Sequence, residues 1–168
     1  PGERSSIRAG LETMGGIAEQ NQFGANIESF YREGTEPLSN PVVSEIFSNI
    51  NKGAAVLTFF GHSSSDNSFD FNIDSPDNYL NKPKYPLMFS FGCYSGNLFT
   101  KTRGISERFV FLEDKGTVVF GASRGLGLIG ALSQLGRSFY DYMGSSHYGE
   151  SIGNTLLASY GDIPLFDL

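Results

Sequence analysis

Cysteine and histidine are scarce in this chain of 168 residues, which contains one cysteine, two histidines and no tryptophan. A single cysteine cannot form an internal disulfide, and it cannot supply a cysteine-rich zinc site. If the thiol of Cys93 works with an imidazole, its partner is either His62 or His147. The scarcity therefore reduces any Cys–His hypothesis to two pairs.

Basic residues are also few, with 12 Lys and Arg against 18 Asp and Glu, and the formal net charge is −6. This charge argues against nucleic-acid binding, which needs a basic face that releases counterions. Only 18% of the residues are charged, whereas 15 Phe and 8 Tyr supply much apolar surface. The composition thus excludes a disordered chain, and the length suits one domain with its own core.

Long hydrophobic runs are absent as well. The longest, Ala54 to Phe60, is too short to cross a bilayer, and we recognise no targeting signal. Because the chain starts at Pro1 rather than at Met, we interpret it as a fragment of a longer polypeptide without its N-terminal part. A signal peptide or a lipid anchor can lie outside this sequence.

Apolar periodicity predicts alternating helices and strands. We expect helices over residues 4–20, 40–53, 105–113, 128–142 and 152–160, and strands over 27–31, 54–60, 86–91 and 117–121. Asn40 is expected to cap its helix, with Pro41 at the first helical position. The strands start about 30 residues apart, as in βαβ units with right-handed crossovers. The pattern predicts a single α/β domain over residues 1–168 with a mostly parallel sheet.

Two predicted strands run directly into glycine-flanked residues that can carry chemistry. Strand 54–60 leads into Gly61-His62, and strand 86–91 leads into Gly92-Cys93. In open parallel sheets, functional residues gather beyond the carboxyl ends of the strands. If these two strands are neighbours, His62 and Cys93 project from one edge, as a thiol nucleophile and its imidazole base require. The imidazole would stabilise the thiolate and protonate the leaving amine.

Each of these residues alone has a plainer interpretation. A lone cysteine is usually a small buried hydrophobe, and a lone histidine is usually a hydrogen-bonded polar residue. Their joint placement, 31 residues apart and each after a strand and a glycine, favours the catalytic interpretation. His147 lies in the polar turn Ser-Ser-His-Tyr-Gly and is expected to be an exposed loop residue.

Further segments accompany the two strand ends in a fixed order. They are Asn81-Lys82-Pro83-Lys84-Tyr85-Pro86, the turn Phe89-Ser90-Phe91-Gly92-Cys93-Tyr94-Ser95-Gly96, Ile105 to Phe109, Lys115 to Ser123 and Tyr148 to Gly153. Together with Gly61-His62, this set resembles the gingipain family of cysteine peptidases, a member of the caspase-like group. The resemblance covers about residues 51–157.

The resemblance implies a caspase-like three-layer α/β sandwich, with a mostly parallel sheet and helices on both faces, and endopeptidase chemistry. His62 would be the base and Cys93 the nucleophile. The oxyanion donors would be the backbone N–H groups of Cys93 and of Ser63, or its neighbour. The acid that orients His62 is left open between Glu28, Glu3 and a residue upstream of the sequence.

The same resemblance implies that no cofactor is required and that the substrate is a protein or peptide. It also implies secretion or a place on the bacterial cell surface, since the family includes surface proteases and a sortase-like peptidase of type IX secretion. An alternative function is a catalytically inactive caspase-like module for interaction or cell-surface assembly. Two features motivate that alternative: Ser63, where the family usually has glycine, and the late start of the chain relative to a full family catalytic domain.

The segment Gly121 to Gly127 imitates the glycine-rich turn of a nucleotide-binding oxidoreductase. Only 41 residues follow Gly127, and no Tyr-x-x-x-Lys motif is found after it, so we reject that function. In the peptidase interpretation this loop lies at the active edge and walls the substrate cleft. Arg124 there could contact a substrate carboxylate or be solvated, and we favour the solvated interpretation.

The polar stretch from Ser63 to Asn78 carries four aspartates: Asp66, Asp70, Asp74 and Asp77. We interpret it as a solvated loop beside the active edge. Its spacing does not match an EF-hand, so structural calcium is left open with no ligand assigned, as is an acidic subsite for a basic substrate residue. Residues 63–65 are serines without a Gly-x-Ser-x-Gly elbow, and we expect them to form turns.

Overall fold

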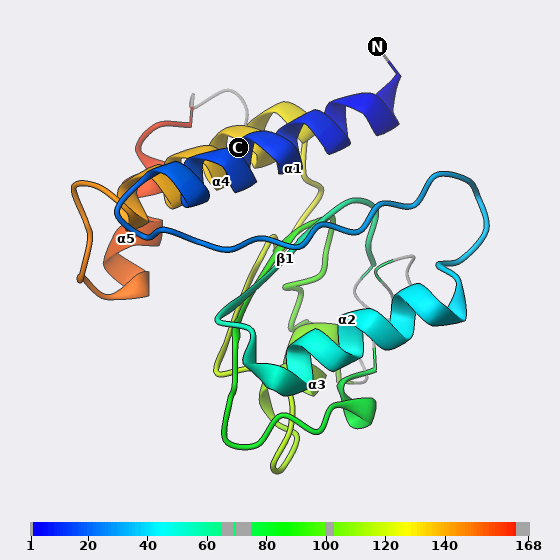
Figure 1. Ribbon diagram of the computed structural model, residues 1–168. Coiled ribbons are helices and arrows are strands. Elements are labelled where there is room, and N and C mark those ends of the chain that lie inside the picture. Colours follow the sequence, from blue (N-terminus) through cyan, green and yellow to red (C-terminus); the bar gives the residue numbers. More distant parts are fainter. Residues whose placement is uncertain (1, 65–68, 70–74, 100–102, 164–168) are drawn as a thin grey trace. The chain divides into compact units, whose positions relative to one another are not determined.

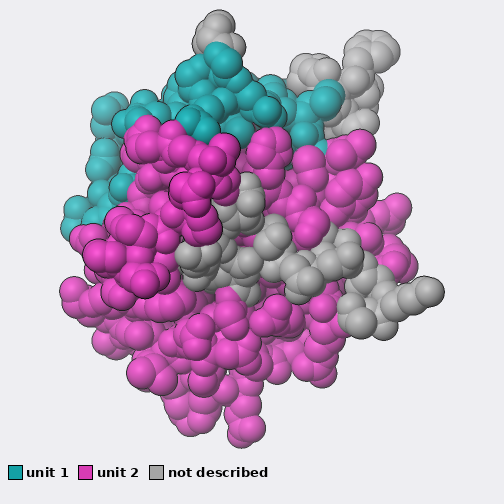
Figure 2. Space-filling model, turned by 90° about the vertical axis from the view of Figure 1, so that its right-hand side faces the viewer, with its two compact units in different colours: residues 1–29, 127–168 teal, residues 30–126 magenta. Residues whose placement is uncertain are grey.

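The computed structural model describes residues 2–64, 69, 75–99 and 103–163 (Figure 1). Its elements are α1 (Glu3–Gln20), α2 (Asn40–Gly53), β1 (Val56–Phe60), the 3-10 turn η1 (Pro76–Asn78), β2 (Leu87–Phe91), α3 (Ile105–Val110), β3 (Val119–Ala122), α4 (Ile129–Met143) and α5 (Ile152–Tyr160). They form two compact units, coloured separately in Figure 2: unit 1 holds residues 1–29 and 127–168, and unit 2 holds residues 30–126. That the chain is a single domain and a fragment stays a prediction.

The three strands lie in unit 2 and form one parallel sheet. Their order is β1-β2-β3, so β2 is central. In this register Phe60 faces Phe91, and Ser90 faces Ala122. The predicted strands 54–60, 86–91 and 117–121 and the parallel sheet are confirmed, with starts one or two residues later than expected.

One face of the sheet packs with α2 and α3 in a continuous apolar cluster. Phe59 of β1 and Met88 of β2 lie in it, joined by Ile50 of α2 and Phe109 of α3. Aromatic rings fill much of the space, and Phe109 stands 5.4 Å from Phe120 between ring centroids. Burying each such side chain stabilises the fold by about 1.5–3 kcal/mol, so this cluster is what holds the strand ends of unit 2 in place.

The opposite face of the sheet is also buried and aromatic. It carries Phe60, Phe89 and Phe91, each at most 6% exposed. The ring of Phe89 occupies the space over Gly121, its register partner on β3, where a Cβ atom would lie 2.6 Å from the ring. The sheet is therefore buried on both faces, as the continuous apolar run of β1 indicated.

The helices match the expected ranges to within one residue except at the end of α3, and the N-cap of α2 also differs from the expectation. The N-cap of α2 is Ser39, and Asn40 is already helical, with Pro41 in the first turn. Helix α3 ends at Val110, three residues before the expected end. The chain reverses direction after α3 through Asp114 and Gly116, which both have positive φ. The N–H of Thr117 then donates a 2.8 Å hydrogen bond to the carbonyl oxygen of Phe109. Helix ends of this kind depend on capping contacts that periodicity does not reveal.

A buried asparagine ties the approach to β2 to the turn before β3. Asn81 is fully buried, and its Nδ2 donates to the carbonyl oxygens of Gly116 at 2.8 Å and Lys84 at 3.2 Å. Its Oδ1 accepts from the N–H of Gly116 at 3.2 Å. These bonds satisfy backbone groups of two separate segments, which explains the need for an amide at this position.

Unit 1 is helical. Helix α1 packs against α4, and α4 packs against α5. Asn21 links the first two, since its Nδ2 donates to the carbonyl of Tyr140 at 2.7 Å. Its side chain also occupies the place that a Cβ on Gly144 would take. In the described part of the chain, we find no helix with the length and apolarity needed to span a membrane.

The predicted strand over residues 27–31 is wrong. None of these residues belongs to a strand or helix. Ile27 packs against Gly15 of α1, whereas Phe30 packs against the apolar cluster of unit 2. The apolar side chains thus serve a connecting segment, because a strand exists only where a neighbouring strand accepts its hydrogen bonds.

Candidate active site

The register of β1 and β2 brings the two candidate catalytic residues to equivalent positions. Phe60 and Phe91 are partners, and the ladder continues with a 3.4 Å bond from the N–H of Gly61 to the carbonyl of Phe91. His62 follows Phe60 by two residues, and Cys93 follows Phe91 by two residues. The expectation that these strands are parallel neighbours is confirmed, while the pairing of the imidazole with the thiol stays a prediction.

The exposure of these residues fits chemistry at a surface. His62 is exposed, and Cys93 is a partly buried residue that forms no disulfide. A cysteine that served only in packing would be fully buried, whereas a reactive thiol must be reached by a reagent or substrate. Cys93, with its intermediate burial, is not sealed in the core.

Ser63 makes a direct contact with the candidate nucleophile. Its Oγ donates a 2.6 Å hydrogen bond to the carbonyl oxygen of Cys93. Among the described residues other than glycine, only Tyr94 and Asp114 have positive φ. The backbone of Ser63 is therefore not in the strained left-handed conformation. The backbone at position 63 therefore does not require glycine.

Gly92 allows the strand ends to approach closely. A Cβ atom on Gly92 would overlap Ser63 Oγ and would lie 2.9 Å from the carbonyl oxygen of Gly61. The residue before Cys93 must therefore be glycine for steric reasons alone, without any need for positive φ.

The turn after Cys93 is tied to the end of β3. Tyr94 has φ 56° and its N–H donates to the carbonyl of Gly125 at 2.9 Å, while the N–H of Gly96 donates to the carbonyl of Ser123 at 2.9 Å. A hydrogen bond between the buried hydroxyls of Ser90 and Ser95, 2.7 Å apart, joins β2 to the same turn. The loop after β3 thus contacts the turn after Cys93, while its role as a wall of a substrate cleft stays a prediction. The serine pair flanks Cys93 in the sequence, but nothing in the sequence marked it.

Exposed apolar side chains accompany these two loops. Leu98 and Phe99 follow the turn after Cys93 and are 59% and 80% exposed, and Leu126 after β3 is 76% exposed. We call these three residues the apolar rim. Arg124 is exposed, and its guanidinium lies 5.3 Å from the ring centroid of Phe99. Arg124 is thus exposed, as expected, and it also stacks on the rim.

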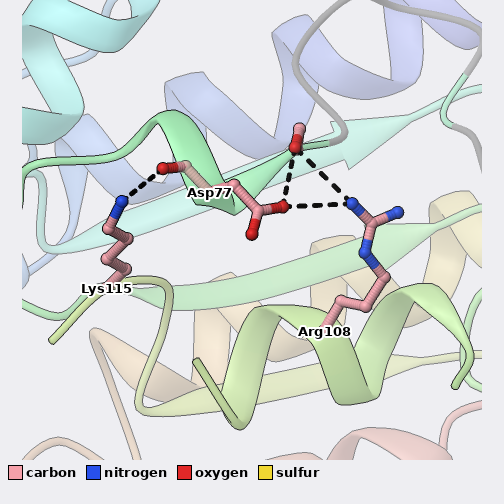
Figure 3. A network of polar contacts seen from close by, with 4 residues as sticks. Asp77, Arg108 and Lys115 are labelled. Carbon is pink, nitrogen blue, oxygen red and sulfur yellow. Dashed lines mark hydrogen bonds and ion pairs between the residues drawn. The ribbon is translucent and has the colours of Figure 1, made fainter. Parts of the chain in front are cut away.

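Asp77 is the aspartate of the stretch Ser63 to Asn78 that lies among the described residues, and it connects η1 to neighbouring segments. Its carboxylate accepts from Ser75 Oγ at 2.8 Å and from Arg108 of α3 at 3.2 Å, and its carbonyl accepts from Lys115 Nζ (Figure 3). The Ser75 hydrogen bond, followed by that of Arg108, lowers the pKa of Asp77 below its ordinary value. These contacts anchor η1 to α3. Asp66, Asp70 and Asp74 lie outside the described residues.

The remaining candidates have more ordinary surroundings. His147 was expected to be exposed, and this is wrong: it is half-buried, with its ring 5.2 Å from that of Tyr142 and its Nδ1 2.9 Å from Ser146 Oγ. Glu3 and Glu28 are exposed residues of unit 1, and their role in orienting His62 stays a prediction. Within the described ranges, no three His, Cys, Asp or Glu residues gather into a group that could hold a metal ion.

The similarities to known proteins cover most of the chain. Residues 8–163 match the model of peptidase family C25. The chain is similar to the crystal structure of the Arg-specific cysteine proteinase gingipain R, with 15% identity and a TM-score of 0.71, over 92% of this chain and 38% of that one. It is also similar to the complex of Porphyromonas gingivalis RgpB pro- and mature domains, with 15% identity and a TM-score of 0.69, over 91% and 38%. No curated protein matches the sequence.

The chain spans well under half the length of these two solved structures. At 15% identity the likeness shows the fold. The caspase-like α/β fold predicted from the sequence is confirmed.

Proposed function

The chain belongs to peptidase family C25, and we propose that it acts as a cysteine endopeptidase, with Cys93 as nucleophile and His62 as general base. The observation that carries this proposal is the parallel register of β1 and β2, which gives His62 and Cys93 the same offset from the pair Phe60–Phe91. Two further observations support the same assignment. Cys93 is partly exposed, and hydrogen bonds from Ser63 to the Cys93 carbonyl and from the Tyr94 N–H to Gly125 hold its turn.

The proposed reaction has two steps. The imidazole of His62 takes the thiol proton, and the Cys93 sulfur attacks the scissile carbonyl carbon and forms a bond to it. The backbone N–H groups of Cys93 and Ser63 stabilise the oxyanion. The C–N bond then breaks as the imidazolium protonates the leaving amine. Water, deprotonated by the same imidazole, releases the new carboxylate and restores the thiol, so no cofactor enters the balance.

The substrate of the proposed reaction is a polypeptide. The apolar rim gives it a surface, since Leu98, Phe99 and Leu126 lie on the loops that are tied to the nucleophile turn. The resemblance to gingipains supports secretion or a place on the bacterial cell surface, including a link to type IX secretion.

Thiol alkylation tests the catalytic pair directly. We expect iodoacetamide to modify Cys93 faster than free cysteine at neutral pH, because the neighbouring imidazole favours the thiolate. His62→Ala should slow this alkylation and lower kcat for peptide hydrolysis by about 10²–10⁴-fold. His147→Ala is the matched control and should leave both rates unchanged. Peptide hydrolysis that survives Cys93→Ala would remove Cys93 as the nucleophile.

The inactive interaction module predicts a different result in the same assay. Its thiol would react no faster than free cysteine, and His62→Ala would change nothing. One of the two motives for that alternative was Ser63, and Ser63 is accommodated without positive φ. Active hydrolysis by the wild-type chain would exclude the inactive module.

A further inference from the structure

The peptide group that follows Cys93 is held from both sides. The carbonyl oxygen of Cys93 accepts the 2.6 Å bond from Ser63 Oγ, and the N–H of Tyr94 donates the 2.9 Å bond to Gly125. Carbonyl and N–H belong to one planar unit, so the two bonds together fix its orientation. Ser63 follows β1 and Gly125 follows β3. The loops after the two outer strands thus hold the turn after the central one.

This orientation needs support because Tyr94 is left-handed, with φ 56°. For a residue other than glycine that conformation costs about 1–2 kcal/mol and persists only where the surroundings enforce it. Rotation of the Cys93–Tyr94 peptide would relieve the strain, and it would also change ψ of Cys93, on which the side-chain rotamers open to that residue depend. The bond from Ser63 opposes that rotation at the carbonyl end.

We propose that Ser63 is a positioning residue for Cys93. Its side-chain hydroxyl holds the carbonyl of the nucleophile, and so it fixes the direction of the thiol. The same bond links the two residues whose backbone N–H groups are the proposed oxyanion donors, which holds those donors at a set separation. Preorganised donors and nucleophiles raise the rate of the chemical step without a matching gain in substrate binding. This inference rests on the proposed peptidase function.

The residue before the nucleophile is matched to this role. Gly92 leaves free the space that Ser63 Oγ occupies, because a Cβ there would overlap the hydroxyl. A glycine at position 63 would have no hydroxyl to donate, so the bond to the Cys93 carbonyl depends on the serine side chain.

The test compares Ser63→Ala, Ser63→Thr and the control Ser44→Ala, which removes an exposed hydroxyl from α2. Each variant is assayed for kcat and KM on a peptide substrate, for Cys93 alkylation by iodoacetamide and for its unfolding midpoint. We expect Ser63→Ala to lower kcat by about 10–100-fold with KM within about twofold. Ser63→Thr keeps the hydroxyl and should restore kcat to within about threefold of wild type. Ser44→Ala should match wild type.

The outcomes separate this inference from the function on which it rests. If the wild type hydrolyses peptides and Ser63→Ala has the same kcat, the positioning role is overturned and the peptidase stands. The role is also overturned if folded Ser63→Thr is as slow as Ser63→Ala, because the hydroxyl is then not what matters. If the wild type neither hydrolyses peptides nor shows enhanced alkylation, the proposed function fails, and the positioning role fails with it.

Discussion

Phe60 of β1 and Phe91 of β2 are register partners in a parallel ladder. Each phenylalanine is followed by one glycine, and after that glycine comes His62 in the first segment and Cys93 in the second. A shift of the register by one residue would separate the imidazole and the thiol by about 3.3 Å along the strand direction. The aromatic pair is thus the structural basis for the proposed catalytic pair.

Gly92→Ala should damage both stability and activity. The new methyl group would overlap Ser63 Oγ and press on the Gly61 carbonyl at 2.9 Å. We expect a loss of about 1–3 kcal/mol in the free energy of unfolding, measured by denaturant titration. Gly130→Ala is the control, because a Cβ there meets nothing within 4 Å.

A double variant sharpens this prediction. Ser63→Gly removes the overlapping side chain, so Ser63→Gly with Gly92→Ala should be more stable than the sum of the single effects predicts. Simple additivity would show that Ser63 and Gly92 do not share this space.

Asn81→Leu should destabilise the protein strongly. The substitution leaves the buried N–H of Gly116 and the carbonyl groups of Gly116 and Lys84 without the amide that binds them. We expect a loss of about 2–4 kcal/mol in the free energy of unfolding. Asn26→Ala, at an exposed position, should change it by less than about 0.5 kcal/mol. A small effect at Asn81 would mean that the two turns hold without it.

Asp77→Asn should lower stability at neutral pH and not in acid. The folded-state pKa of Asp77 is lowered from 3.8 by Ser75 and Arg108, so its carboxylate stabilises the fold above pH 3.8. That contribution is lost as pH falls through the lowered pKa. Since Asp77 is 55% exposed, we expect only about 0.5 kcal/mol at pH 7. Unfolding curves at pH 7 and pH 3 measure the difference.

The control for Asp77 is Glu45→Gln, which removes an exposed carboxylate of α2 outside this network. It should have no comparable effect at either pH. An Asp77→Asn effect that stays constant, or grows, in acid would contradict the charge-based account.

Phe99→Ser should weaken substrate binding without slowing chemistry. Phe99 is 80% exposed, so the fold does not depend on its burial. If the apolar rim contacts the substrate, KM should rise by about 3–10-fold with kcat within about twofold. Phe111→Ser is the matched control, because Phe111 is 65% exposed at the end of α3 and outside the rim. An unchanged KM would remove Phe99 from the substrate surface.

The local patterns of the sequence were sufficient for most of the elements. Helices α1, α2, α4 and α5 and the three strands follow from apolar periodicity and glycine stops, because these signals act within a few residues. The prediction of a strand over residues 27–31 was wrong for the same reason. Its apolar pattern is typical of a strand, but strand pairing depends on long-range contacts that a local pattern does not contain. Family motifs in addition pointed to the two strand ends that carry His62 and Cys93.

By itself, then, the sequence determined the α/β class, the family and the two residues proposed for catalysis, because composition, periodicity and motif order are properties of the linear chain. Only the tertiary structure decided the register that aligns those residues and the hydroxyl bond from Ser63 to Cys93. It also decided the use of Asn81 to join two turns. These contacts join residues about 30 positions apart, and hydrogen-bond partners at that separation are chosen by packing rather than by local propensity.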